Sequence, residues 1–400
     1  MSRPVALYVH WPFCQSKCPY CDFNSHVGKR IDHAEWREGL LAELEHYAAE
    51  TSGRFVSSLY FGGGTPSLMK AGTVAAIIDA AEDLWGLAEG IEITLEANPS
   101  SAEAARFRDY HTAGVNRVSV GVQSLNDSAL TFLGRRHNAA EARRALCDTA
   151  HIFDRFSFDM IYGLPGQTVE SWRDELVEAL AMAAGHISVY QLAIEPGTVF
   201  FRDHVRAADE DLSADLFTLT RELLCDAGLP AYEVSNHAGP GRKSRHNLTY
   251  WRGGDYIGVG PGAHGRLNIG AEFVATHQIH DPLRWLEKVT KTGHGTAKRR
   301  YLEPSERAEE MIMAGLRLAE GLDVSRLQEL SGLMLDDMLD PNKLEQCLKA
   351  ELLYWQEQHL TATERGIACL NALTAALLAP AEPVLSLSRN EISLEPAGSP

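Results

Sequence analysis

The sequence predicts an α/β fold: an incomplete, TIM-like barrel of about six β/α units, followed by a small helical domain of winged-helix type. First, short apolar runs rich in β-branched residues alternate with helix-like stretches along residues 1–228, a pattern typical of a parallel sheet with right-handed crossovers. Second, there are about six such units, whereas a closed barrel needs eight. Third, the chain from Pro304 onward has helical periodicity and one short candidate for a β-wing.

Length and composition limit the classes to which the protein can belong. Its 400 residues suffice for roughly two or three domains, and its formal net charge of −17 disfavours a general binder of nucleic acid or anionic membranes. No run approaches the roughly 18 apolar residues of a membrane span, and Pro12, Cys14 and Lys17 interrupt the N-terminal apolar run that a signal peptide would need. We therefore expect a soluble, cytoplasmic protein that binds no nucleic acid.

The expected elements follow one another in the order of a β/α barrel. The strands are short apolar runs, and the helices have apolar residues at helical spacing. The expected strands are Ala6–His10, Ser58–Gly62, Ile91–Glu96, Arg117–Gly121, Ser157–Ile161 and Ile187–Ala193. The expected helices are His33–Ala49, Gly72–Leu84, Ala102–Thr112, Asp127–Leu133, Ala139–His151, Val169–Ala184 and Ser213–Ala227.

Changes in this pattern predict the domain boundaries. Residues 1–228 are expected to form the barrel, 229–300 a Gly- and aromatic-rich extension, and 301–378 the helical domain. Residues 379–400 hold four of the 17 prolines without a clear period, which predicts a disordered tail. In the helical domain we expect a β-wing around Thr361–Cys369 and helices at Ser305–Ala319, Val324–Leu330, Asn342–Glu351 and Leu370–Leu378.

Polar or glycine-rich segments follow the expected strands at their carboxyl ends. Parallel barrels place their chemistry on this face, so the functional site is expected there. The segments are the cysteine loop after the first strand, then Gly62–Pro66, Glu96–Pro99, Gln123–Ser124, Gly163–Gln167 and Glu195–Thr198.

Cys14, Cys18 and Cys21 lie close together in the run CQSKCPYC. Three thiolates at this spacing can bind one metal centre, but structural zinc commonly takes two CxxC-like pairs, and no second pair exists. Three cysteines without an obvious fourth favour a 4Fe–4S cluster with one iron open to another ligand. The other cysteines are interpreted as small buried hydrophobic residues; they are Cys147, Cys225, Cys347 and Cys369.

The Cys-x3-Cys-x2-Cys spacing after a first barrel strand resembles the motif of radical S-adenosylmethionine (SAM) proteins. The resemblance implies that the open iron binds SAM and that an electron donor reduces the cluster, which then cleaves SAM. The flanking runs Tyr8–Cys14 and Tyr20–Phe23 are similar to the oxygen-independent coproporphyrinogen III oxidase family, which includes the HemW-type heme chaperones. This resemblance extends from about Ala6 to Leu378, nearly the whole chain.

The same resemblance implies a SAM site built from several strand ends. The run Gly62–Gly64 matches the glycine-rich segment of the superfamily, in which missing side chains allow a ligand to approach the backbone. Carboxylates such as Glu96 and Asp159 suit ribose hydroxyls or an ammonium group. The residues that match the family's SAM contacts are Tyr8, Tyr20, Gly63, Gly64, Thr65, Glu96, Gln123, Arg135 and Asp159.

Three features favour the heme-chaperone branch over the oxidase branch. The oxidase branch carries a further cysteine two positions after the third cluster cysteine, where this chain has Phe23. It also has a longer segment before the cluster, whereas the first cluster cysteine here is Cys14. Finally, His246–Trp251 matches the H-N-x-x-Y-W motif of the heme chaperones. Since a neutral imidazole is a common axial heme ligand, His246 is the expected heme ligand, with His264 as a second candidate.

Together these features predict a heme chaperone that binds heme and transfers it to an acceptor hemoprotein, with no residue assigned a catalytic role. The expected cofactors are a 4Fe–4S cluster, SAM and heme. One alternative is an oxygen-independent coproporphyrinogen III oxidase (dehydrogenase) that forms protoporphyrinogen IX; another is a SAM enzyme acting on a different tetrapyrrole. The sequence does not identify the acceptor, and it is compatible with peripheral contact to membrane-bound acceptors and with a monomer or a homodimer.

One local charge reversal accompanies the expected heme motif. The segment Gly239–Arg252 contains Arg242, Lys243, Arg245 and Arg252 and no acidic residue. It is either a solvated basic loop or a cationic patch around His246 that would pair with heme propionates.

Overall fold

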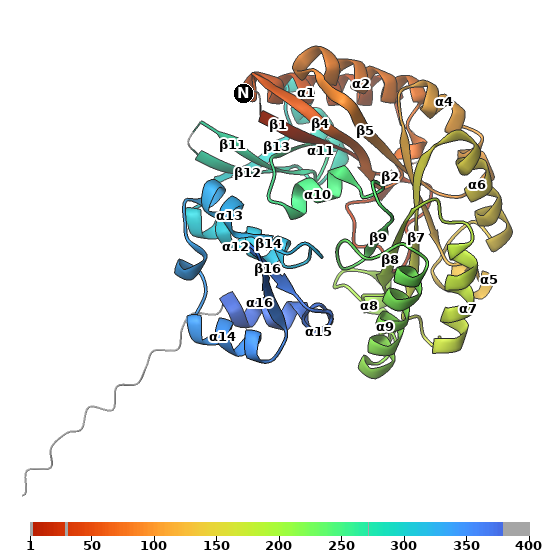
Figure 1. Ribbon diagram of the computed structural model, residues 1–400. Helices are drawn as coiled ribbons and strands as arrows, with labels where there is room; N and C mark the ends of the chain where they lie inside the picture. Colours follow the sequence, from red (N-terminus) through yellow and green to blue (C-terminus); the bar gives the residue numbers. More distant parts are fainter. Residues whose placement is uncertain (1–2, 29–30, 271, 379–400) are drawn as a thin grey trace, which may run out of the picture.

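The computed structural model describes residues 3–28, 31–270 and 272–378, and within them the main feature is a mixed sheet of 11 strands (Figure 1). The strand order is β13-β12-β11-β10-β1-β4-β5-β6-β7-β8-β9. Its middle part consists of parallel strands in chain order that curve into an open barrel, with helices on the outer side. The barrel strands are β1 (Arg3–Trp11), β4 (Arg54–Gly63), β5 (Leu87–Ala97), β6 (Arg117–Gln123), β7 (Arg155–Tyr162) and β8 (His186–Gln191).

The predicted α/β fold with an incomplete barrel is confirmed, and every predicted barrel strand is present. One helix prediction is wrong: the stretch Ala102–Thr112 forms two helices rather than one. In the second helix Phe107 and Tyr110, three residues apart, share one face and are both buried in the core. The helices of this part are α1 (His33–Glu50), α2 (Ala71–Trp85), α3 (Ser101–Ala104), α4 (Phe107–Thr112), α5 (Asp127–Phe132), α6 (Ala139–Ile152), α7 (Val169–Leu180) and α9 (Glu210–Asp226).

The barrel strands are buried along most of their length because helices cover one face and side chains fill the other. In β1, for example, Val5–Leu7 and Val9–Trp11 are all buried. Such strands appear in the sequence as continuous apolar runs rather than as alternating patterns, which is why they were predictable. Helix starts are fixed by local caps, as in α6, where Asn138 and Glu141 form a capping box.

An extension after the barrel widens the sheet beyond β1. Strand β10 (Tyr256–Val259) pairs in parallel with β1, and β11 (His264–Ile269), β12 (Glu272–Gln278) and β13 (Thr296–Tyr301) continue as an antiparallel meander. Helix α11 (Pro282–Thr292) packs on α1 through Trp285 and Trp36, whose rings stack at 5.4 Å between centroids. Strand β13 is the outer edge of the sheet, and its run Lys298–Arg300 is exposed.

The C-terminal domain has its own apolar core and a small sheet in the order β14-β16-β15. The predicted wing is present but misplaced: it is the hairpin of β15 (Leu353–Gln356) and β16 (His359–Ala362). The residues after it form a helix because the Thr363 side chain accepts a hydrogen bond from the Gly366 N–H (3.1 Å). The other elements are β14 (Leu322–Asp323), α12 (Pro304–Gly315), α13 (Val324–Ser331), α14 (Pro341–Lys349), α15 (Glu364–Ala368) and α16 (Leu370–Leu378).

The remaining strands and helices are short. Strands β2 (Phe13–Cys14) and β3 (His26–Val27) pair on either side of the cysteine loop, and β9 (Asn236–Ala238) pairs antiparallel with β8. Helix α10, which contains the expected heme motif, spans Arg245–Trp251. The remaining short helices are α8 (Val199–Arg202), η1 (Pro66–Leu68) and η2 (Leu335–Asp337).

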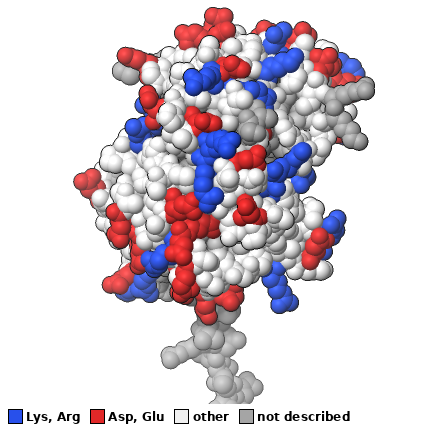
Figure 2. Space-filling model, turned by 90° about the vertical axis from the view of Figure 1, so that its right-hand side faces the viewer, with Lys and Arg blue, Asp and Glu red and all other residues white. Residues whose placement is uncertain are grey.

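The surface on the outer helices of the barrel carries mixed charge. On the face shown in Figure 2, acidic and basic side chains lie side by side, and the ion pair between Arg143 of α6 and Glu178 of α7 is an example. Among the described residues, every helix falls short of the length and apolarity needed to cross a membrane. The predicted disordered tail, residues 379–400, lies outside the described residues.

Candidate functional site

A cavity of about 400 Å³ lies at the carboxyl ends of the barrel strands, where the sequence predicts the site. Its wall is formed by the cysteine loop and by residues at or after the ends of the following barrel strands. Of the predicted site residues, Tyr8 and His246 are not part of this wall as the structure describes it. Those that line it are Cys14, Cys18, Cys21, Tyr20, Gly63, Gly64, Thr65, Glu96, Gln123, Arg135 and Asp159.

The three cysteines of the loop are half-buried on one wall of this cavity. Thr65 Oγ1 donates a hydrogen bond to Cys14 Sγ (3.3 Å), and Arg135 Nη1 donates one to Cys18 Sγ (3.4 Å). Burial raises the pKa of the Cys14 thiol, so a bound cation would be needed to stabilise its thiolate. Three thiols facing one cavity, two of which already accept hydrogen bonds, fit the donor set of an iron–sulfur cluster.

The other cysteines are not buried, and that prediction is wrong. Cys147, Cys225 and Cys369 are exposed and Cys347 is half-buried. On helices α6 and α9 the neighbouring leucines take the positions that face the core, because Leu146 and Leu224 are 1% and 0% exposed. The cysteines next to them therefore point outward.

The glycine-rich turn after β4 packs tightly against the strand that leads into the cysteine loop. A Cβ atom on Gly63 would lie 2.6 Å from the His10 ring, and Gly63 has φ of +113°, a conformation that other residues rarely adopt. A Cβ atom on Gly64 would lie 2.9 Å from the carbonyl oxygen of Phe13. The Gly64 N–H donates to the carbonyl oxygen of Trp11 (2.7 Å). The glycines therefore fix the position of the cysteine loop, in addition to any contact with a ligand.

Two half-buried carboxyl groups, those of Glu96 and Asp159, face the cavity from different strands of the sheet. Burial raises the pKa of Glu96 to about 7 and that of Asp159 to about 6. Glu96 accepts hydrogen bonds from Tyr60 Oη (2.9 Å) and from the Gly63 N–H (3.2 Å). A bound cation or hydroxyl donor would favour the ionised form of both groups.

Arg135 connects the cysteine loop to the ends of the strands. Its Nη1 lies 3.5 Å from Tyr20 Oη, and its Nη2 donates to the carbonyl oxygen of Gly121 (2.8 Å) and to the side-chain oxygen of Asn98. Its Nε is buried and has no hydrogen-bond partner in the described part of the chain. Buried donors are nearly always satisfied, so this Nε indicates room for an additional acceptor. Gln123, also on the wall, adopts a left-handed conformation with φ of 71°.

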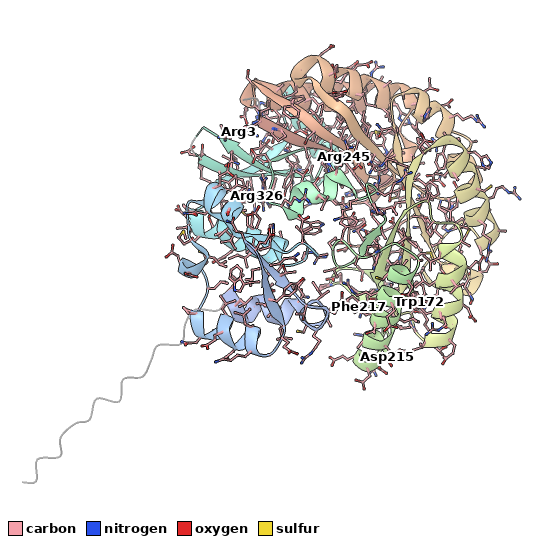
Figure 3. The ribbon with its side chains drawn as sticks, viewed as in Figure 1. Arg3, Trp172, Asp215, Phe217, Arg245 and Arg326 are labelled. Atoms are coloured by element: carbon pink, nitrogen blue, oxygen red, sulfur yellow. The ribbon has the colours of Figure 1, made fainter. Side chains whose placement is uncertain are left out.

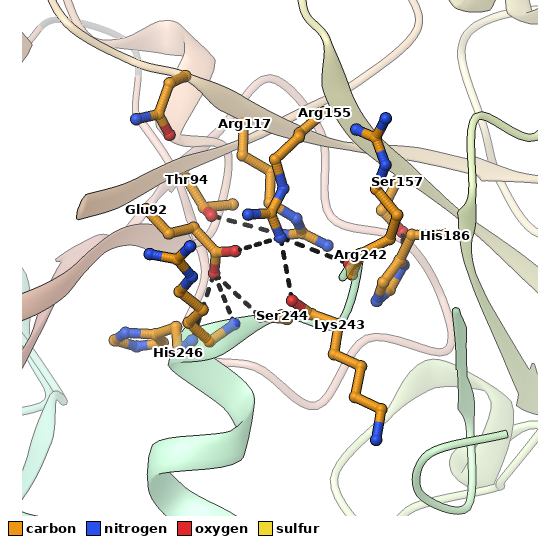
Figure 4. Close-up of polar contacts among 12 residues, drawn as sticks. Glu92, Thr94, Arg117, Arg155, Ser157, His186, Arg242, Lys243, Ser244 and His246 are labelled. Carbon is orange, nitrogen blue, oxygen red and sulfur yellow. Dashed lines mark hydrogen bonds and ion pairs between the residues drawn. The ribbon is translucent and has the colours of Figure 1, made fainter. Parts of the chain in front are cut away.

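A buried polar network lies in the barrel interior beside helix α10 (Figure 4). Glu92, which is 2% exposed, accepts hydrogen bonds from the N–H groups of Arg245 (2.9 Å) and His246 (3.3 Å). It also forms an ion pair with Arg155 (2.9 Å). Arg117 is 3% exposed in the same network and lines the cavity. These contacts fix the start of α10 against the barrel.

His246, the expected heme ligand, is enclosed in the barrel at 1% exposure. Its Nδ1 hydrogen-bonds Ser58 Oγ (2.9 Å), its Nε2 hydrogen-bonds Tyr250 Oη, and its ring stacks on Tyr60 at 4.8 Å between centroids. Burial and the nearby Arg117 guanidinium lower its pKa to about 3, so the imidazole is neutral. Both ring nitrogens are thus engaged, and ligation of heme iron would require release from either Ser58 or Tyr250. This role of His246 stays a prediction.

The other predicted residues outside the cavity have different environments. Tyr8 is largely buried, and its Oη lies 3.1 Å from His10 Nδ1. His264, the second candidate heme ligand, is exposed and stacks on His277 at 3.9 Å between ring centroids. Tyr8 reaches the cavity wall indirectly, because its ring stacks on that of Tyr60, a wall residue, at 6.2 Å between centroids.

Of the two interpretations of the basic segment, the structure favours the solvated loop, because the side chains of Arg242 and Arg252 do not contact His246. His246 lies inside the barrel, whereas Arg242 Nη1 donates to the carbonyl oxygen of Asp154 (2.8 Å). Arg252 forms an ion pair with Glu320 of the C-terminal domain (2.6 Å). The segment turns its side chains outward because its backbone N–H groups at the start of α10 bond to buried Glu92.

Several residues of the cavity wall were missed by the sequence analysis. Asn98 belongs to the run after β5 and could have been found from its place at a strand end. Arg117 begins β6, where a charged residue is ordinarily exposed, so no sequence signal marked it. Asn236 and Asn247 come from β9 and α10, more than 200 residues after the cysteines, and only the fold brings them to the cavity.

Comparisons with known proteins agree with this architecture. Residues 8–179 match the radical SAM superfamily, and residues 302–369 match the HemN C-terminal domain. The chain is 38% identical over 393 residues to the heme chaperone HemW of Escherichia coli, a match that covers 94% of this chain and 98% of that protein. It is 40% identical to the mouse protein named radical S-adenosyl methionine domain-containing protein 1, mitochondrial, with 94% and 88% covered.

A solved structure has the same fold over most of the chain. The coproporphyrinogen III oxidase HemN of Escherichia coli, described as a radical SAM enzyme, superposes with a TM-score of 0.80 and covers 94% of this chain and 90% of that one. Its sequence identity is 22%, so this likeness concerns the fold alone. The relatives, by contrast, match in sequence over nearly their full length. The chain therefore belongs to the HemW family of radical SAM proteins.

Proposed function

We propose that this protein is a heme chaperone that binds heme and passes it to an acceptor hemoprotein, using a radical SAM core that carries a 4Fe–4S cluster and SAM. The observation that carries the proposal is the sequence identity of 38% with the heme chaperone HemW over 94% of this chain and 98% of that protein. A match of this extent includes the cysteine loop, α10 and the C-terminal domain together. The acceptor and the electron donor are proposed as further partners, and the cytoplasm as the compartment.

The residues of the cavity have separate proposed roles. Cys14, Cys18 and Cys21 would hold the cluster, and the cluster with SAM would supply single-electron chemistry when bound. Thr65 and Arg135 support the thiolates by donating hydrogen bonds to sulfur. The other proposed SAM contacts are Tyr8, Tyr20, Gly63, Gly64, Glu96, Gln123 and Asp159.

Glu96 and Asp159 suit the polar part of SAM. Desolvation raises the pKa of both half-buried groups, so a ligand that donates hydrogen bonds or carries positive charge would favour their ionised forms. An amino-acid ammonium or ribose hydroxyls would meet that need. We also propose the domain division: residues 1–228 form the SAM-binding unit, residues 229–300 an extension, and residues 301–378 the C-terminal unit.

Phe23 argues against the oxidase alternative. It occupies the position of the further cysteine of the oxidase branch, lines the cavity mouth and is 62% exposed. A phenyl ring cannot replace a thiol in hydrogen transfer or in metal binding. The chaperone function is therefore favoured over oxidation of coproporphyrinogen III.

Two assays on the reconstituted full chain test this function. We expect hemin to bind at about one equivalent with a shifted Soret band, and we expect no protoporphyrinogen in an anaerobic assay with SAM, a reductant and coproporphyrinogen III. Absence of hemin binding by the wild type would overturn the chaperone function. Formation of protoporphyrinogen would establish the oxidase function instead.

A further inference from the structure

The cavity at the cysteine loop continues into the interior of the barrel. Arg117 is the first residue of β6 and Gln123 is the last, and both line the cavity. A rise of about 3.3 Å per residue places them up to roughly 20 Å apart along the strand. Gln123 is one of the proposed SAM contacts and Arg117 is not. The inner end of the cavity, at Arg117, is therefore distinct from the end at the cysteine loop.

Helix α10 borders this inner end. Asn247, the second residue of the expected heme motif, lines the cavity. The Arg117 guanidinium lies near the helix, because it contributes to the lowered pKa of His246, the residue next to Asn247. Arg245, at the start of the helix, instead lines a second cavity toward the C-terminal domain (Figure 3). The motif helix therefore separates the two cavities and presents Asn247 to the barrel interior.

Arg117 is a buried cation without a carboxylate partner. It is 3% exposed, and it forms no ion pair within the described chain. Its one hydrogen bond among the described residues is long, from Nη1 to Thr94 Oγ1 (3.5 Å). A guanidinium has five N–H donors, and a buried charge is costly unless it is paired and hydrogen-bonded. The unused donors of Arg117 therefore indicate an acceptor that comes from a ligand.

The neighbouring Arg155 shows the opposite situation on the next strand. It lies in register with Arg117 and forms an ion pair with Glu92 (2.9 Å). The other oxygen of Glu92 accepts hydrogen bonds from the N–H groups of Arg245 and His246 (Figure 4). Both oxygens of this carboxylate are thus engaged, and Arg117 is left without a partner.

Asn247 supplies an uncommitted amide at the same end of the cavity. It is half-buried, and its side chain forms no hydrogen bond in the part of the chain that the structure describes. Asn236, also on the wall, differs: its Nδ2 donates to Glu233 (2.6 Å) and its Oδ1 accepts from Ser188 (3.0 Å). The amide of Asn247 can therefore donate to the same ligand as Arg117.

The charges around the inner end favour a small ligand with one negative charge. Asp159 of β7 and Glu96 of β5 also line the cavity, so a second negative charge on the ligand would be repelled. One unpaired guanidinium balances one carboxylate, whose planar oxygens match its donors. Next to Arg117 along β6 the wall continues with Ser119, which is polar. The lining thus lacks the extended apolar faces that a tetrapyrrole needs.

We propose that Arg117 and Asn247 form a subsite for the carboxylate of a small monocarboxylic ligand, further inside the barrel than SAM. The Arg117 guanidinium would pair with the carboxylate, and the Asn247 amide would donate a hydrogen bond to it. This inference goes beyond the proposed heme function and does not depend on it. It also gives the second residue of the motif a role that is separate from heme.

Propionate is the probe, and saturation-transfer NMR on the full-length, cluster-reconstituted protein with SAM measures its binding. Propionate should bind saturably, whereas uncharged propionamide and inorganic phosphate should bind at least about tenfold more weakly. Arg117→Met and Asn247→Leu should each weaken propionate binding about tenfold, because hydrogen bonds to a charged group are the stronger ones. Arg108→Met on the exposed face of α4 is the matched control and should bind propionate like the wild type.

Urea unfolding without ligand separates a binding role of Arg117 from a structural one. Arg117→Met should unfold at the same urea concentration as the wild type or at a higher one, since it removes an unpaired buried charge. Arg155→Met is the matched comparison at the same register. It should unfold at a lower urea concentration, because it leaves the buried carboxylate of Glu92 without its cation.

Four results would overturn the subsite. They are no saturable binding of propionate by the wild type, propionamide or phosphate binding as tightly as propionate, wild-type affinity for propionate in Arg117→Met, and a loss of stability in Arg117→Met as large as that in Arg155→Met. All of them leave the chaperone function standing, because hemin titration of the wild type tests that function separately. Failure to bind hemin would in turn leave the propionate result unchanged.

Discussion

The two cavities differ in how their polar groups are used. At the carboxyl ends of the barrel strands, Glu96 and Arg135 are held by hydrogen bonds to the sheet and its loops. In the second cavity, of about 1250 Å³ between the barrel and the C-terminal domain, the side chains of Arg245 and Arg326 donate only to backbone carbonyl oxygens and come from two domains. The first is a pre-organised site on rigid strands, whereas the second depends on how the two domains pack. Substitutions in the two regions should therefore have effects of different size.

The largest expected effect is loss of the cluster. Replacement of Cys14, Cys18 and Cys21 by Ser should abolish the visible iron–sulfur absorbance of the reconstituted protein, because the thiolates of these cysteines are the cluster ligands. The barrel should still fold, because these side chains are half-buried in a loop. Ultraviolet–visible and circular dichroism spectra check both points.

The exposed cysteines supply the control for this experiment. A variant with Cys147, Cys225 and Cys369 replaced by Ser should keep the full absorbance, because all three lie outside the cavity wall. Retention of a complete cluster in the first variant would contradict the assignment of the cysteine loop.

The next effect concerns the rigid packing of the barrel site. Gly63→Ala should lower the free energy of unfolding by about 2–4 kcal/mol, because its Cβ would lie 2.6 Å from the His10 ring and φ is +113°. Gly72→Ala is the matched control: a Cβ there meets open space, and the helical position should gain about 0.5–1 kcal/mol. Urea unfolding measures both, and equal stabilities would show that the turn is not tightly packed.

The barrel site should also make stability depend on pH. Glu96 has a pKa of about 7 in the fold against an ordinary value of 4.5, so the folded state binds more protons between these values. The wild type without ligands should therefore lose about 2–3 kcal/mol relative to Glu96→Gln as the pH rises from about 4.5 to about 7. Urea midpoints at pH 5 and 7.5 measure the difference.

A control for the pH experiment is the exposed Glu89. Glu89→Gln should change stability by less than about 0.5 kcal/mol at either pH. If the wild type and Glu96→Gln had parallel pH profiles, Glu96 would be ionised in the fold across this range.

The smallest effect is expected where the two domains meet. Arg221 of α9 forms a bidentate ion pair with Glu364 of α15, whose side chain is 73% exposed. A double-mutant cycle with Arg221→Ala and Glu364→Ala should give a coupling energy of about 0.2–1 kcal/mol at low salt and less in 1 M NaCl. A value above about 2 kcal/mol would mean that the domain interface is as rigid as the barrel site.

The fold and the cysteine site were predictable from local sequence. The barrel strands are continuous apolar runs, and the cysteine loop and glycine turn follow them directly along the chain. The wing was misplaced because Thr361 and its neighbours have strand-like composition, whereas the Thr363 cap starts a helix two residues later. The local sequence pattern does not show where the strand ends and the helix begins.

The environment of His246 could not be predicted from the motif. His246 and Tyr250 share a helix face, but which face enters the barrel is decided by distant residues, namely Ser58 of β4 and Glu92 of β5. For the same reason the sequence did not show that Arg245 and His359, more than 100 residues apart, line one cavity.

The outer edge of the 11-stranded sheet has a consequence for solubility. A strand at a sheet edge offers unpaired backbone groups to another chain, which favours aggregation. Strand β13 occupies this edge and presents the charged, exposed run Lys298–Arg300. To pair, two such edges would have to desolvate Lys298 and the ion pairs of Arg299 with Glu50 and of Arg300 with Glu306. Edge-to-edge growth of the sheet is thereby disfavoured, and association of two copies would use another surface.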